Sequence, residues 1–182
     1  MARAVHVVNY IEIPDDVKVE IRGKSVVVKG LKGEIVRDFS YARDIDIRIE
    51  DNKVVIEAFF ADSKKKALIY TISSHISNMI IGVTKGWRYK LKVVSSHFPV
   101  SVKVVGDYVV IENFLGEKAP RKARILEGVK VKTEGKDIIV EGVDIEKVAQ
   151  TAANIELATK IRDKDRRIFV DGIYIYEKGV AE

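Results

Sequence analysis

Two segments of the chain alternate between apolar and polar residues, which is the pattern of a β-strand with one buried face. Residues 17–22 read Val-Lys-Val-Glu-Ile-Arg, and residues 45–50 read Ile-Asp-Ile-Arg-Ile-Glu. Residues 51–53, Asp-Asn-Lys, form a short turn into an apolar strand over 53–60. Because the intervening positions are polar, we expect antiparallel sheets with one face exposed to water.

Helical periodicity begins after two aspartates, Asp62 and Asp144, and aspartate is a favoured N-cap residue. Gly82 is expected to end the first helix. One helix then covers the apolar face of each sheet, as in a two-layer α+β domain. The apolar positions at helical spacing in the first helix are Ala67, Leu68, Ile72, Ile76, Met79 and Ile80, and the residues expected to line the buried side of the second helix are Val148, Ala152, Ile155 and Leu157.

The two halves of the chain repeat one another in four blocks that occur in the same order. We therefore predict an α+β fold of two tandem copies, residues 1–82 and 83–182, with the boundary near Gly82 to Lys85. Each copy is expected to be a mostly antiparallel sheet covered on one face by a single helix. The aligned blocks are 14–19 with 99–104, 26–28 with 109–111, 33–34 with 116–117, and 54–57 with 138–141.

Composition and motifs exclude most kinds of chemistry. The chain has no cysteine, so disulfides and thiolate metal sites are excluded. Its three histidines, His6, His75 and His97, lie in different elements without carboxylate or imidazole partners at metal-binding spacing. Residues 23–25, Gly-Lys-Ser, resemble the end of a phosphate-binding loop, but Lys18 stands where that motif needs glycine. We expect neither an enzyme nor a cofactor.

No apolar leader and no long uncharged apolar run is present, so a soluble, cytoplasmic protein without membrane contact is expected. The net charge of +5 favours a polyanionic partner. Basic residues gather over 85–92, 118–124 and 160–167, all from the predicted boundary onward, whereas the first copy has only Lys64 to Lys66. Arg and Lys in such clusters suit RNA phosphates. The alternative is a solvated basic surface.

Three motifs stand out in the second half of the chain: residues 167–178, RIFVDGIYIYEK, residues 85–91, KGWRYKL, and residues 113–118, NFLGEK. With these motifs the chain resembles the archaeal and eukaryotic branch of the large-subunit ribosomal protein L-six family, and the resemblance covers essentially the whole chain. The resemblance implies a structural protein bound to large-subunit ribosomal RNA beside the stalk base and the sarcin–ricin loop. Neighbouring ribosomal proteins of the stalk base and translation factors are then expected nearby. The second domain is expected to make most RNA contacts, and the first to be peripheral.

Charge and resemblance together predict an RNA-binding set in the second domain. Trp87 and Tyr89 either stack on bases or belong to the core. Asp171-Gly172 is expected to form a tight turn between two short strands, so that the cations before it are held in place. The competing hypothesis is a protein–protein adaptor that pairs through exposed sheet edges. The predicted RNA-binding residues are Lys85, Arg88, Lys90, His97, Asn113, Lys118, Arg121, Lys122, Arg124, Lys160, Arg162, Lys164, Arg166 and Arg167.

Overall fold

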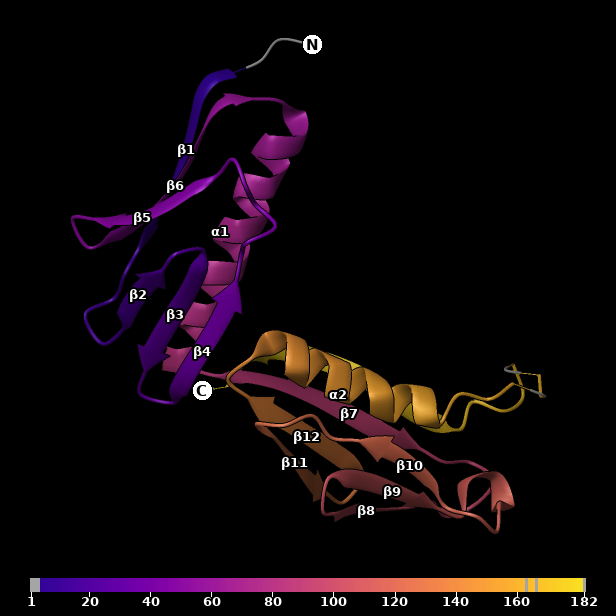
Figure 1. Ribbon diagram of the computed structural model, residues 1–182. Coiled ribbons are helices and arrows are strands. Elements are labelled where there is room, and N and C mark those ends of the chain that lie inside the picture. The colour runs from indigo at the N-terminus through magenta and orange to yellow at the C-terminus, as the bar shows by residue number, and fades with distance from the viewer. Residues whose placement is uncertain (1–3, 163, 166, 182) are drawn as a thin grey trace. The chain divides into compact units, whose positions relative to one another are not determined.

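The computed structural model describes residues 4–162, 164–165 and 167–181. The chain forms two compact units, residues 1–85 and 86–182 (Figure 1). The first unit runs past Gly82 because its helix continues to Thr84. Each unit combines antiparallel strands with one long helix, which confirms the predicted α+β class.

Unit 1 places six strands and helix α1 around one core. The strands form two antiparallel sheets, in the orders β1-β6-β5 and β2-β3-β4. Helix α1 packs against both sheets and buries residues such as Ile69, Ile72 and Ile76. The elements are β1 Ala4–Glu12, β2 Lys18–Arg22, β3 Ser25–Gly30, β4 Gly33–Asp38, β5 Asp46–Glu50, β6 Lys53–Ala61 and α1 Ser63–Thr84.

Unit 2 repeats this arrangement and adds one strand. Its sheets have the orders β10-β9-β8 and β11-β12-β7-β13, again with antiparallel pairs, and α2 lies along them (Figure 1). The core includes Leu91, Ile111, Phe114 and Ile155, each at most 1% exposed. The elements are β7 Trp87–Val94, β8 Ser101–Val105, β9 Tyr108–Glu112, the 3-10 turn η1 Phe114–Gly116, β10 Arg121–Arg124, β11 Val129–Glu134, β12 Asp137–Gly142, α2 Ile145–Ala158 and β13 Gly172–Val180.

The same strand order in both units confirms the tandem duplication predicted from the aligned blocks. β2-β3-β4 corresponds to β8-β9-β10, and β1-β6-β5 corresponds to β7-β12-β11. Each helix is capped as expected. The Asp62 carboxylate accepts a hydrogen bond from the Lys65 N–H at 2.8 Å, and the Asp144 carboxylate accepts one from the Glu146 N–H at 2.9 Å. Each unit divides its strands between two sheets, where we predicted one.

Two local predictions about the helices are wrong. Gly82 does not end α1, because it is buried within the last turn, and the Lys85 N–H closes the helix on the Ile81 carbonyl. A glycine packed inside a helix need not act as a stop. Leu157 is not buried, because it lies off the stripe of α2 that contacts the sheets, and it is 60% exposed beside Phe169. In α1, the predicted apolar residue Ala67 is also exposed.

A third prediction, a hairpin at Asp171-Gly172, is wrong as well. Among the described residues, β13 is the single strand in this region, and it begins at Gly172. Asp171 is 1% exposed and accepts hydrogen bonds from the turn after β7. Asp171 is therefore a buried carboxylate that accepts hydrogen bonds from backbone N–H groups elsewhere in the fold, and it does not form a tight turn.

Helix α1 is long and apolar enough to cross a membrane by length and composition alone. It spans Ser63–Thr84, and 44% of its most apolar window is buried in the protein. Gly30 of β3 lies close against this helix, since a Cβ added there would lie 2.8 Å from the Val83 Cγ2 atom. The apolar composition of α1 is therefore explained by its packing in the core of unit 1.

Candidate nucleic-acid interface

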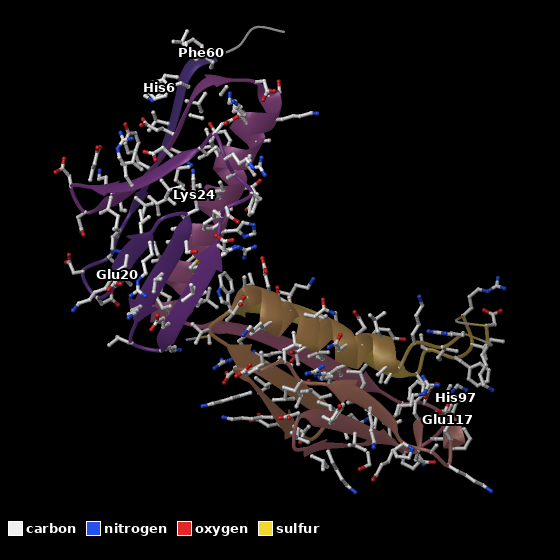
Figure 2. All side chains as sticks on the ribbon, viewed as in Figure 1. His6, Glu20, Lys24, Phe60, His97 and Glu117 are labelled. Atoms are coloured by element: carbon white, nitrogen blue, oxygen red, sulfur yellow. The ribbon has the colours of Figure 1, made fainter. Side chains whose placement is uncertain are left out.

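Three segments that are distant in sequence meet at one end of unit 2. They are the turn after β7 (residues 95–100), the loop that contains η1 (residues 113–120), and the described residues between α2 and β13 (159–162, 164–165 and 167–171), and we call this region the loop end. Asn113 Nδ2 donates a hydrogen bond to the Pro99 carbonyl at 3.0 Å, and the Ser96 N–H donates one to the Asp171 Oδ1 at 2.7 Å. Figure 2 shows His97 and Glu117 at this end.

The loop of residues 113–117 has a constrained backbone. Asn113 and Leu115 both have left-handed φ angles, 57° and 51°, a conformation that is rare for leucine. Between them, Phe114 is 1% exposed and anchors the loop in the core. Gly116 has φ 76°, and a Cβ there would lie 3.3 Å from the Phe98 ring. The loop is therefore held in one shape by its own packing.

Arg121, one of the predicted RNA-binding residues, stabilises this loop instead. Its guanidinium group donates two hydrogen bonds to the Glu117 carboxylate, at 2.6 and 2.8 Å, and lies 4.6 Å from the centre of the Phe114 ring. The hydrogen bonds from Arg121 lower the pKa of Glu117, and those to Glu117 raise the pKa of Arg121. With its guanidinium group over the Phe114 ring and its Nε, Nη1 and Nη2 atoms all donating hydrogen bonds within the protein, Arg121 links η1 to the end of α2.

His97 is held in one orientation by a buried carboxylate. Its Nδ1 lies 2.6 Å from the Asp171 Oδ2, and the backbone N–H groups of Ser96 and His97 donate to the Asp171 Oδ1 at 2.7 and 3.2 Å. Burial acts to raise the pKa of Asp171, but the hydrogen bonds from His97 and Ser96 outweigh burial and hold that pKa well below its usual range. An ionised carboxylate only accepts, so the hydrogen bond to Asp171 requires the His97 proton on Nδ1.

Aromatic and basic side chains extend this site. The His97 ring stacks on Phe169, with 4.5 Å between the ring centres, and the Lys164 Nζ lies 4.6 Å from the centre of the Phe169 ring. Phe98 is 44% exposed beside them. The loop end thus combines an oriented imidazole, an exposed aromatic ring and a cation, which are groups that suit RNA bases and phosphates.

Several predicted RNA-binding cations are engaged in ion pairs on the protein surface. Arg88 pairs with Glu141 at 2.5 Å, and Lys90 pairs with Glu177 at 2.9 Å, both across strands of the β11-β12-β7-β13 sheet. Arg167 pairs with Asp165, two residues before it. Cations already matched by carboxylates are weaker candidates for phosphate than unpaired ones.

A second group of predicted cations is exposed without an ion-pair partner among the described residues. Lys122 and Arg124 project from the outer face of β10, whereas Arg121 and Ala123 face α2, as strand alternation requires. The other members of this group are Lys118, Lys160 and Arg162.

The remaining predicted residues fall elsewhere. Lys85 lies in unit 1, and Arg166 lies outside the described residues. Trp87 and Tyr89 are half-buried and pack against the core of unit 2, so the core interpretation holds for them. In the described part of the chain, no group of three or more His, Cys, Asp or Glu side chains could hold a metal ion.

Sequence reasoning missed the residues that organise the loop end. Glu117 stands four residues before Arg121, a spacing that could have signalled the pair. Asp171 lies 74 residues from His97, and no local pattern connects the two. Phe169 is half-buried against the core and also stacks on His97.

The chain is similar over most of its length to proteins of one known family. The sequence pattern of the ribosomal protein L6 family matches residues 13–86 and 98–172, one match in each unit. The chain belongs to this family. A protein named large ribosomal subunit protein uL6 from Aeropyrum pernix is 62% identical over 180 residues, which cover 99% of each chain. Those of the same name from Ignicoccus hospitalis and Saccharolobus solfataricus are 61% identical over 184 residues and 59% identical over 172 residues, covering 99% and 94% of this chain and 99% and 95% of theirs.

Membership of the ribosomal protein L6 family confirms the resemblance that the three motifs indicated. Proteins of this family are structural constituents of the ribosome and not enzymes, so the chain is a ribosomal protein and the prediction of a non-enzyme is confirmed. The two matches also agree with the duplication seen in the strand order.

Proposed function

We propose that the chain binds large-subunit ribosomal RNA mainly through the loop end of unit 2. The observation that carries this proposal is the group of exposed, unpaired cations beside a loop that is already ordered. Counterion release makes each phosphate contact favourable, and side chains on a rigid frame lose less entropy on binding than side chains on a flexible one. Unit 1 is then the peripheral domain, since its main basic run, Lys64 to Lys66, includes a lysine that pairs with Asp44.

The family resemblance implies a position for the chain in the large ribosomal subunit. We expect the chain to lie beside the stalk base and the sarcin–ricin loop of the large subunit, in cytoplasmic ribosomes. Ribosomal proteins of the stalk base are its expected neighbours, with translation factors close by. Hydroxyl-radical footprinting of large-subunit RNA should show protection at the sarcin–ricin loop when the full-length protein is bound. Protection confined to other regions would contradict this placement.

Salt dependence tests the contribution of the loop end. Replacing Lys118, Lys160 and Arg162 of the loop end by alanine in the full-length chain should weaken binding to large-subunit ribosomal RNA. The slope of log K against log salt should fall by roughly 0.7 to 0.9 for each RNA phosphate that the variant no longer neutralises. Arg121 is left intact, because its removal would disturb the loop rather than only the charge.

The matched control removes three other exposed lysines, Lys130, Lys132 and Lys136, which lie on β11 and in the turn after it. This variant loses the same charge from a different part of unit 2 and should keep the wild-type slope. Filter binding over a salt series measures both variants. Equal losses of affinity in the two variants would mean that binding follows net charge and not the loop end.

A further inference from the structure

Strand β1 has one open edge, whereas its counterpart in unit 2 is covered. β1 pairs with β6 from Ala4 opposite Ala61 to Glu12 opposite Lys53, with the pairing interrupted at Val5 and Phe60, where Phe60 has a left-handed φ of 52°. Its other edge pairs with no strand among the described residues. The corresponding strand β7 pairs with β12 on one edge and with antiparallel β13 on the other. In unit 2, an antiparallel strand therefore occupies the position that is open beside β1 in unit 1.

The composition of β1 differs from that of the other edge strands. Exposed edges are usually protected against pairing by lysine, other charges or proline. β1 reads AVHVVNYIE and contains no Lys, Arg or Pro. It is nine residues long and rich in β-branched residues, which makes it a template for a further strand. The other strands at sheet edges in the described part of the chain, each of which carries Lys or Arg, are β2, β4, β5, β8, β10, β11 and β13.

Two hydrogen bonds show which backbone groups face the open edge. The Ile13 N–H donates to the Asn52 carbonyl at 3.1 Å, on the side of β6. The Tyr10 N–H donates to the Asn9 Oδ1 at 3.0 Å instead of to β6. Because N–H groups alternate along an edge strand, those of His6 and Val8 also point away from β6. The Asn9 side chain already accepts the hydrogen bond of the Tyr10 N–H. The part of this edge that is open to a further strand, among the described residues, is therefore residues 4–8.

Apolar side chains are exposed around this stretch, and β1 itself contains no Lys or Arg. Val5 is 71% exposed, and Phe59 and Phe60 on the paired strand are 58% and 66% exposed. His6 stacks on Phe59 at 4.5 Å, and Figure 2 shows His6 and Phe60 at the same end of unit 1. Clustered exposed apolar residues mark protein contacts, whereas RNA phosphates require Lys or Arg. The chemistry of the edge favours a protein segment over RNA.

We propose that residues 4–8 of β1 accept an extended, apolar segment of a neighbouring ribosomal protein as an additional antiparallel strand. The added strand takes the place that β13 has in unit 2, with its backbone bonded to His6 and Val8 and its side chains against Val5 and Phe60. This gives the peripheral unit a protein-binding role that is separate from RNA binding by the loop end. It rests on assembly of the chain into the large subunit, and not on which RNA it contacts.

Amide hydrogen exchange in the full-length protein tests the proposal, first free and then in purified large subunits. The His6 and Val8 amides should exchange at least about tenfold more slowly in the subunit, the change expected for one net hydrogen bond. The Val7 amide, which faces β6 in both states, should change less. Equal exchange of His6 and Val8 in the two samples would overturn the proposal. Failure of the wild-type protein to enter subunits would instead count against the proposed function.

Two variants separate strand addition from general burial. Val5→Lys adds the charge that β1 lacks, and Leu31→Lys adds the same charge at an 83% exposed turn position away from the edge. Both should fold and enter the subunit, and the protection of Val8 should be lost only with Val5→Lys. A photo-crosslinker at position 5 should attach to one ribosomal protein. Crosslinks to ribosomal RNA or to a second copy of this chain, or protection that survives Val5→Lys, would refute the proposal.

Discussion

Replacing Asp171 by alanine removes the carboxylate that joins the turn after β7 to the start of β13. Asp171 is 1% exposed and accepts hydrogen bonds from the backbone and side chain of both Ser96 and His97. Replacement by asparagine keeps one carbonyl oxygen for the two backbone N–H groups but removes the charge. Comparing the two variants therefore separates the contribution of the backbone hydrogen bonds to stability from that of the ionised group.

The expected loss of stability follows from these four contacts. A hydrogen bond to a charged group contributes about 1.5 to 3 kcal/mol, and part of this is regained where water can replace the missing partner. Ser96 and His97 are exposed at their outer sides, so water reaches them. We expect Asp171→Ala to lower the free energy of unfolding of unit 2 by about 3 kcal/mol, and Asp171→Asn by about 1 kcal/mol.

The loss should depend on pH in one direction. The folded-state pKa of Asp171 is depressed, so its ionised form stabilises the protein above the unfolded pKa of about 3.9. That stabilisation disappears as the pH falls toward the folded pKa. The difference in unfolding free energy between wild type and Asp171→Asn should be constant above about pH 5 and should shrink below about pH 4.

Urea unfolding followed by tryptophan fluorescence measures these differences, because Trp87 is the one tryptophan and packs against the core of unit 2. Asp165→Asn is the control, since that carboxylate has a lowered pKa but an exposed ion pair with Arg167, and it should lower the unfolding free energy much less than Asp171→Asn. Equal stabilities of the Ala and Asn variants would refute the role given to the backbone contacts. A difference that grows toward low pH would refute the assigned charge state.

Two further predictions concern packing. Arg121→Ala should lower the unfolding free energy of unit 2 by about 2 kcal/mol, because it removes the bridge between η1 and α2, whereas Lys122→Ala should change it by under about 0.5 kcal/mol in the same urea assay. Gly30→Ala should lower the melting temperature, because the added methyl group meets Val83 at 2.8 Å, at a cost of about 1 to 3 kcal/mol. Gly179→Ala, with no atom within 4 Å of the added Cβ, is its control in the same calorimetric scan, and equal shifts would contradict the close approach.

Local signals in the sequence determined the secondary structure and the duplication. The alternating residues 17–22 and 45–50 form strands β2 and β5, apart from their first residues. Asp62 and Asp144 cap the two helices as expected, because an N-cap depends on side chains within a few residues. The repeated blocks identified two copies of one fold, since identical patterns of buried positions require the same packing.

The tertiary structure alone decided which of the described cations lack an ion-pair partner and where the buried groups lie. Lys122 and Arg121 are neighbours in sequence, but strand alternation exposes one and turns the other toward α2, where the Glu117 carboxylate engages it. His97 and Asp171 meet only because β7 and β13 pair. Contacts between residues this distant depend on strand pairing and packing across the core, and no local pattern in the sequence encodes them.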